Sequence, residues 1–177
     1  MECVLDTATV AAFQRVGVFD RLRDAAAPPF VIVDAVCLEL TRGEGAPSRP
    51  SARPSRQEWL RVEPLPAAVF AARIHSLMND RKLGRTVDLG EAASIAFCAE
   101  HPDTLFVTPD CGGLFAAFKH LYGLQTRAWS FQSFVRFLVE TRGLPAKNVR
   151  ALVNYADSGR SLEPIWWGDW TASLPTL

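Results

Sequence analysis

Short apolar runs alternate with amphipathic stretches along most of this chain. Val4–Leu5 is expected to form a short buried strand, and a helix is expected over residues 7–26, where apolar residues recur at helical spacing. Phe30–Val33 is a continuous apolar run, typical of a strand that is covered on both faces. A further helix, with apolar residues at Val36, Leu38 and Leu40, follows this strand directly.

The rest of the chain continues the alternation of strand and helix. The expected elements are a short edge strand at 59–62, helices at 67–79 and 89–100, a strand at 105–107, a helix at 112–121, a strand at 125–129, and helices at 130–140 and 146–157. Strands that alternate with helices form parallel sheets with right-handed crossovers. The sequence therefore predicts an α/β fold, a three-layer α/β/α sandwich with a central parallel sheet of four to five strands.

Two segments lack this periodicity. Residues 43–57 are rich in Gly, Pro, Ser and Arg, which predicts a flexible loop. Residues 158–177 form a C-terminal tail with indoles at Trp166, Trp167 and Trp170. These rings either stack on bases, fold back on the domain or meet a partner. The predicted organisation is one domain over residues 1–157, followed by the tryptophan-rich tail.

Four acidic side chains stand close to the ends of predicted strands or the starts of helices. Asp6 follows the first strand directly, and Asp110 follows the strand at 105–107. Glu39 lies in the helix after the second strand, and Glu91 lies in the first turn of the helix at 89–100. The carboxyl ends of parallel strands converge on one crevice, where such folds bind ligands. We therefore expect the four carboxylates to meet there.

Carboxylates held together repel one another unless a cation compensates their charge. Mg²⁺ prefers oxygen ligands, and Mn²⁺ has a similar preference, so either ion suits such a cluster and could activate water against a phosphodiester. The chain has no His/Cys cluster with zinc-site spacing. Thr7 and Thr108 place hydroxyls beside two of the acids, and either orient metal-bound water or make local turns. Asp88 is a further candidate for the site.

Each acid also has an ordinary structural interpretation. Asp6 and Asp110 precede helices, where an aspartate commonly caps the first free backbone N–H groups. Asp88 and Glu91 have the spacing of a capping box. Glu39 caps nothing, and its alternative is a solvated helix face.

Charge and composition narrow the function further. Nineteen basic and nineteen acidic residues give a net charge of zero, so nucleic-acid binding would need local patches. Arginines in and before the loop are candidates for contacts with RNA phosphates, and a solvated loop is the alternative; they are Arg42, Arg49, Arg53 and Arg56. The scattered cysteines and the lack of an apolar run of about 20 residues fit a cytoplasmic protein without a membrane span.

The acidic segments, taken in order, resemble those of a PIN domain. They are Val4-Leu5-Asp6-Thr7, the stretch from Val33 to Leu40, Leu89-Gly90-Glu91-Ala92, and Val107-Thr108-Pro109-Asp110. The resemblance covers residues 3–140 and implies a Mg²⁺- or Mn²⁺-dependent endoribonuclease, with Asp6, Glu39, Glu91 and Asp110 as catalytic metal ligands. Bacterial PIN domains are often toxins held by an antitoxin protein, and many form homodimers.

The chain departs from the family pattern at two places. One acid, Asp110, stands where many relatives have an adjacent pair, and Ala93 and Ser94 stand where many have a second acid in the helix. These departures favour an alternative, a catalytically weak or inactive PIN-like module that binds RNA or a protein partner. A haloacid-dehalogenase-type phosphatase needs an aspartate where Ala8 stands, and the acidic pair of a phosphorylatable receiver is missing.

Overall fold

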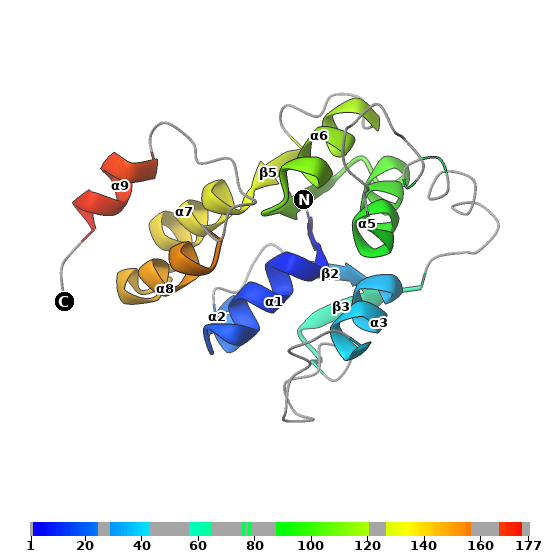
Figure 1. Cartoon of the computed structure of the whole chain (residues 1–177). Helices are drawn as coiled ribbons and strands as arrows, with labels where there is room; N and C mark the ends of the chain where they lie inside the picture. Colours follow the sequence, from blue (N-terminus) through cyan, green and yellow to red (C-terminus); the bar gives the residue numbers. More distant parts are fainter. Residues whose placement is uncertain are drawn as a thin grey trace.

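A five-stranded parallel sheet lies at the centre of the computed structural model (Figure 1). The structure describes residues 2–24, 29–42, 57–64, 76, 78, 88–120, 127–156 and 167–174. The strands are β1 (Glu2–Leu5), β2 (Phe30–Val33), β3 (Leu60–Glu63), β4 (Thr104–Thr108) and β5 (Ala128–Ser130), in the spatial order β3-β2-β1-β4-β5. The first strand of the chain is therefore the central one.

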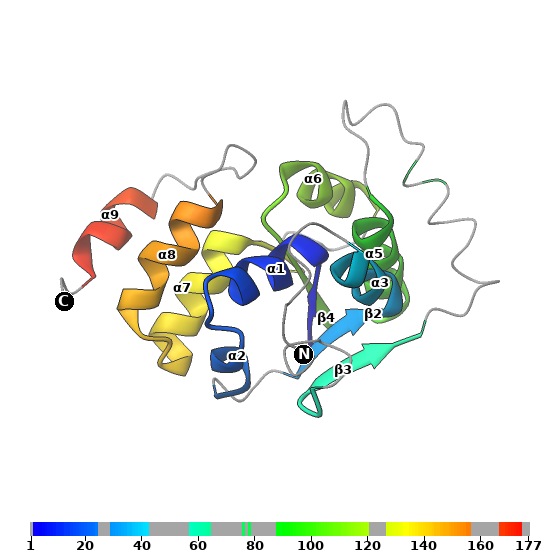
Figure 2. The same ribbon diagram turned by 60° about the horizontal axis from the view of Figure 1, so that its bottom comes forward.

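Helices cover both faces of the sheet (Figure 2). The helices are α1 (Thr7–Arg15), α2 (Asp20–Asp24), α3 (Asp34–Arg42), α5 (Leu89–Glu100), α6 (Cys111–His120), α7 (Phe131–Arg142), α8 (Ala146–Ala156) and α9 (Trp167–Ser173). Helices α1, α7 and α8 pack together on one face, and α5 and α6 lie on the other, while α3 contacts both α1 and α5. This confirms the predicted three-layer sandwich.

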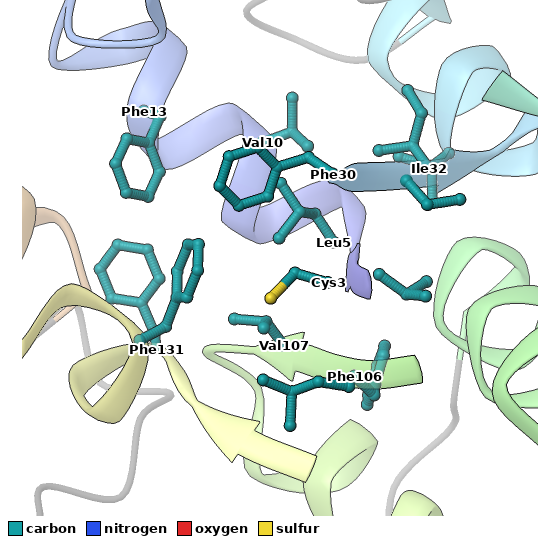
Figure 3. Packing of buried hydrophobic residues seen from close by; sticks show 14 of the residues in the cluster. Cys3, Leu5, Val10, Phe13, Phe30, Ile32, Phe106, Val107 and Phe131 are labelled. Atoms are coloured by element: carbon teal, nitrogen blue, oxygen red, sulfur yellow. The ribbon is translucent and has the colours of Figure 1, made fainter. Parts of the chain in front are cut away.

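Aromatic rings join α1 and α7 to the sheet (Figure 3). The ring of Phe13 meets those of Phe131 and Phe134 edge to face, with centroids 5.8 and 6.1 Å apart. Phe134 in turn packs on Phe30 of β2 at 6.0 Å. Each such pair adds about 0.5–1.5 kcal/mol to the gain from burial, so this cluster fixes α1, and with it the end of β1, against the sheet.

Helix α5 is buried along most of its length. Every residue from Gly90 to Cys98 is buried, because the helix lies between the sheet, α3 and α6. At its C-terminal end the guanidinium of Arg127 donates to the carbonyl oxygens of Cys98 and His101, the latter at 2.9 Å, and to that of Thr104 at 3.1 Å. These bonds satisfy carbonyls that the helix leaves free and fix the orientation of α5 relative to β4.

The single helix predicted over residues 7–26 is wrong. Helix α1 ends at Arg15, Gly17 adopts a left-handed conformation with φ of 75°, and α2 begins at Asp20. The amide of Val18 donates to the carbonyl of Phe13 at 2.9 Å, closing the turn that glycine commonly makes at the end of a helix. The apolar residues after the turn still point inward, which explains why periodicity alone suggested one helix.

Other boundaries differ by a few residues. Strand β3 begins at Leu60, one residue later than expected, because the ring of Trp59 turns aside to pack on Phe19, with centroids 5.1 Å apart. It is an edge strand, as predicted. Strand β5 is shifted to Ala128–Ser130. The predicted loop up to residue 56 and nearly all of the helix expected at 67–79 lie outside the described residues.

Part of the C-terminal tail forms the short helix α9, which the sequence did not predict. The Nε1 of Trp170 donates to Oε1 of Glu140 on α7 at 3.0 Å, and the guanidinium of Arg136 lies 5.9 Å from the centroid of the indole. Trp170 and Leu174 pack against the core cluster. Trp170 therefore folds back on the domain, which is one of the three outcomes expected for these tryptophans, whereas Trp166 lies outside the described residues.

No helix in the described ranges is long and apolar enough to cross a membrane. Among the described residues, Cys3, Cys37 and Cys98 are free thiols. Burial raises the pKa of both Cys3 and Cys98 to about 12, so these two thiols stay protonated and unreactive.

Candidate metal centre

Asp6 is the most completely buried acid of the predicted set. It follows β1 directly and is 1% exposed. Its Oδ1 accepts from the amide of Thr9 at 2.7 Å, so it caps α1 as an aspartate in this position commonly does. Its Oδ2 accepts from Oγ1 of Thr108 at 2.6 Å. The side chain is therefore fixed from both sides and points toward the end of β4.

Thr108 connects two of the acids through one hydroxyl. Besides donating to Asp6, its Oγ1 accepts from the amide of Asp110 at 3.0 Å. The carboxylate of Asp110 folds back onto the start of α6, where Oδ1 accepts from the amide of Gly112 at 2.6 Å. The sequence placed Thr108 beside Asp110 but gave no sign that it would bind Asp6 across the sheet.

Glu91 directs its side chain toward α6. Asp88 caps α5 by accepting from the amide of Glu91 at 2.8 Å, which leaves the Glu91 side chain in the first turn. A β-carbon built on Gly113 of α6 would lie 2.9 Å from Cδ of Glu91 and 3.3 Å from Oγ1 of Thr108. The Glu91 carboxylate thus occupies space that any larger residue at position 113 would need, close to the Thr108 hydroxyl.

The Glu91 carboxylate accepts no hydrogen bond in the described part of the chain, although the residue is 6% exposed. Burial, together with the charges of Asp6, Asp88 and Asp110, raises its pKa to about 9. Burial also raises the pKa of Asp6 to about 7, against the lowering effect of the bonds from Thr108 and Thr9. Glu91 thus requires either a proton or a cation near neutral pH.

Glu39 is held at a different place. Its Oε1 accepts from the amide of Gly90 at 2.7 Å, and its Oε2 accepts a short hydrogen bond from the hydroxyl of Thr7. Burial raises its pKa, the bond from Thr7 lowers it, and the charge of Asp88 raises it. Glu39 therefore lies on the side of α5 that faces α3, and it is not the solvated residue of the alternative interpretation.

Asp88 combines a capping role with proximity to the acids. Its side chain is at the exposed start of α5, and its charge contributes to the raised pKa of Asp6, Glu39 and Glu91. The structure thus gathers the predicted acids around the starts of α1, α5 and α6. The Asp6 carboxylate and the Asp110 amide bond to Thr108, and the Glu91 carboxylate lies beside Gly113 near the same hydroxyl, whereas Glu39 is next to Thr7 and Gly90.

The donor set is composed of carboxylate and hydroxyl oxygens, which fits Mg²⁺ or Mn²⁺ and not zinc. The Glu91 carboxylate, which lies against Gly113, is a donor that the described residues leave without a hydrogen bond. Within the described ranges, no three His, Cys, Asp or Glu side chains are arranged to hold one metal ion as they stand. Binding would therefore require the side chains of Glu91 and Asp110 to turn toward Asp6.

Several predicted contacts fall outside this geometry. Arg42 ends α3 but its side chain is not described, and Arg49, Arg53 and Arg56 lie outside the described residues. Two glycines that shape the site were missed, Gly90 and Gly113. The pair Gly112-Gly113 inside a helix was the available signal, since glycine there costs about 1 kcal/mol relative to alanine and usually has a packing reason.

The chain matches no family model, no curated protein and no solved structure. The resemblance of its acidic segments to a PIN domain rests on those residues. The geometry around Thr108 is thus the basis for assigning a function.

Proposed function

We propose that this protein is a metal-dependent endoribonuclease that cleaves single-stranded RNA, with Mg²⁺ or Mn²⁺ held by Asp6, Glu91 and Asp110. The observation that supports it best is the buried Glu91 carboxylate, which accepts no hydrogen bond from the described residues and stands beside two further acids. A protein gains nothing in stability from such a group unless a proton or cation compensates it. A site for a hard cation explains why it is there.

Each of the three acids would have its own role in holding the cation. Asp6 is the fixed member, because Thr9 and Thr108 hold its two oxygens, and each oxygen keeps a further lone pair for a ligand. Glu91, in the first turn of α5, and Asp110, directly before α6, would turn toward it. A bound divalent cation supplies an activated water and stabilises charge on the phosphate. No side chain of the chain acts as a covalent nucleophile in this scheme.

RNA is proposed as the substrate from the PIN-like order of the acids and from the arginines at positions 42, 49, 53 and 56. These arginines lie between β2 and β3 in the chain, and they would contact phosphates and add a salt-dependent term to binding. We further propose that the protein acts in the cytoplasm as the toxin of a toxin–antitoxin pair, with an antitoxin protein as partner and a homodimer as its assembly.

The test is cleavage of a 5′-labelled single-stranded RNA in the presence of Mn²⁺, comparing the wild type with Asp6→Asn. Asp20→Asn, at the exposed start of α2, is the matched control, because it removes the same charge at a distance from the site. The proposal expects cleavage by the wild type and the control only, and loss of it with EDTA. Equal cleavage by Asp6→Asn and the wild type would refute it.

One observation favours a second candidate, a PIN-like module that binds RNA or a protein and cleaves nothing. No three acidic, His or Cys side chains of the described ranges stand ready to hold one metal ion, and both oxygens of Asp6 already accept hydrogen bonds. This candidate expects RNA binding that persists in EDTA and intact RNA after incubation with Mn²⁺. Binding that disappears with EDTA would count against it.

A further inference from the structure

Three residues from three helices meet at the start of α5, and we call them the Thr7–Glu39–Gly90 clamp. Thr7 is the first residue of α1, Glu39 lies in the middle of α3, and Gly90 is the second residue of α5. The Glu39 carboxylate joins them by accepting from the Thr7 hydroxyl and from the Gly90 amide, the latter at 2.7 Å. The Glu39 side chain thus connects Thr7, which is 32 positions away in the chain, with Gly90, which is 51 positions away.

The clamp is tight enough to explain the glycine. A β-carbon at position 90 would stand 2.5 Å from Oε2 of Glu39, 2.6 Å from the Thr7 hydroxyl and 3.0 Å from Cδ of Glu39. The carboxylate therefore lies against the backbone of α5 itself. Its charge also lies at the positive end of the helix dipole, where an anion is stabilised.

The carboxylates of Glu39 and Glu91 contact different neighbours at the start of α5. The Glu91 carboxylate contacts the Gly113 surface of α6, near the hydroxyl that binds Asp6. The Glu39 carboxylate contacts α1 and the backbone of α5, on the side of α3. Since Gly90 and Glu91 are consecutive residues, an anchor on the Gly90 amide sets the direction in which the Glu91 side chain leaves the helix.

We infer that Glu39 is a positioning residue and not a metal ligand: its carboxylate anchors the start of α5 to α1 so that Glu91 faces Asp6 and Asp110. This inference rests on the proposed metal site, and it changes the role that the PIN resemblance implies for Glu39. It also gives roles to Thr7 and Gly90, which make no hydrogen bond to Asp6, Thr108 or Asp110 in the described part of the chain but hold the anchor in place.

The test separates charge from hydrogen bonding at position 39. Glu39→Gln removes the charge but keeps an oxygen that accepts from Gly90 and an amide that donates to the Thr7 hydroxyl. Glu39→Ala removes both contacts. Asp6→Asn is the variant that loses a ligand, and Glu58→Gln, at an exposed position outside the site, is the matched control. Mn²⁺ affinity is measured by electron paramagnetic resonance of the free ion, and the Gly90 amide is followed by NMR hydrogen exchange.

A positioning role predicts that Glu39→Gln and Glu58→Gln bind Mn²⁺ as the wild type does. Glu39→Ala should bind it roughly 10–100-fold more weakly, as when the residues that orient metal ligands are removed. The Gly90 amide should exchange faster in Glu39→Ala than in Glu39→Gln. Asp6→Asn should lose Mn²⁺ binding while its Gly90 amide keeps the exchange rate of the wild type.

Two results would overturn the inference. If Glu39→Gln weakens Mn²⁺ binding as much as Glu39→Ala, then Glu39 is a ligand. If Glu39→Ala binds Mn²⁺ normally with an unchanged Gly90 amide, then the clamp positions nothing. A wild type that binds no Mn²⁺ would instead refute the proposed function and the positioning of Glu91 for a metal. In that case the exchange rate of the Gly90 amide in Glu39→Ala still tests whether Glu39 anchors the start of α5.

Discussion

Thr108 donates a hydrogen bond from Oγ1 to Oδ2 of Asp6 at 2.6 Å, although the two residues are 102 positions apart in the chain. The same hydroxyl accepts from the amide of Asp110, so one side chain at the end of β4 sets the position of two acids. Each of the three residues belongs to the carboxyl end of a strand, β1 or β4, and these strands are neighbours in the sheet.

Replacing Thr108 by Val should therefore cost stability without changing the shape of the core. The substitution leaves one oxygen of a buried carboxylate and one backbone amide without partners, which costs about 1–3 kcal/mol for such groups. Thr108→Ser keeps the hydroxyl and should retain most of that free energy. Urea unfolding of the three proteins measures the difference, and equal destabilisation by Ser and Val would show that the methyl group matters more than the hydrogen bonds.

Stability of the metal-free protein should fall as the pH rises. The pKa of Glu91 is raised from 4.5 to about 9 and that of Asp6 from 3.8 to about 7, in both cases mainly by burial. The folded protein thus holds these protons more tightly than the unfolded chain, and the resulting stability is complete below the unfolded pKa values and lost as the pH passes the folded ones. Glu91→Gln should flatten the dependence of Tm on pH between about 5 and about 9 in EDTA. A variant curve parallel to that of the wild type would contradict this.

Mn²⁺ should raise the stability of the wild type, because it binds the folded state only. At a free concentration about 100 times its Kd, the gain is about 2.7 kcal/mol, seen as an increase in Tm. Since the ion replaces a proton on Glu91, binding should release protons and tighten as the pH rises. Calorimetry in two buffers with different ionisation enthalpies measures that release. Asp6→Asn should show neither effect, and a similar increase in its Tm would place the ion elsewhere.

Gly113→Ala should separate metal binding from stability. The added methyl group meets the Glu91 carboxylate, which is the end of a flexible side chain and can move away. The free energy of unfolding should change little, because the gain of about 1 kcal/mol of alanine over glycine in a helix offsets the cost of moving the Glu91 carboxylate. Mn²⁺ binding should nevertheless be weakened. Gly168→Ala in α9, where a β-carbon would meet nothing within 4 Å, is the control that keeps binding intact.

Trp170→Ala should release α9 while leaving the domain folded. The substitution removes the hydrogen bond to Glu140 and the contact with Arg136 on α7. Hydrogen exchange in residues 167–174 should accelerate, and exchange in β1 and β4 should stay slow, because the sheet does not depend on this contact. If RNA binding also weakened, the base-stacking interpretation of the tail would return.

The sequence predicted the layers of this fold well because its signals are strong. The buried strands β1, β2 and β4 are each a short apolar run next to a helix signal. The helix Leu89–Glu100 was predicted with its observed ends, because Asp88 and Gly90-Glu91 mark its start. The break at Gly17 was missed, although a glycine directly after Arg15 is an ordinary end signal. Apolar residues on both sides of it concealed the turn.

The site was predicted at a coarser level. Because parallel strands end at one edge, the carboxylates of Asp6 and Asp110 were expected to meet. The Asp6 carboxylate and the Asp110 amide both bond to the Thr108 hydroxyl, whereas the Asp110 carboxylate accepts from Gly112. Glu39 reaches the start of α5 from α3, whereas Glu91 leaves α5 toward α6, and both positions depend on how α3 and α6 pack against α5. Such contacts join residues far apart in the chain, and no local pattern of the sequence encodes them.

The strand order has a consequence for synthesis of the chain on the ribosome. Strand β1 is the central one, but its partner β4 is made about a hundred residues later, since Leu5 pairs with Val107. Until then Asp6 has neither Thr108 nor Asp110 beside it. A product that ended before β4 would consequently carry Asp6 without the residues that align it, so the proposed metal site could form only after residues 104–110 have been made.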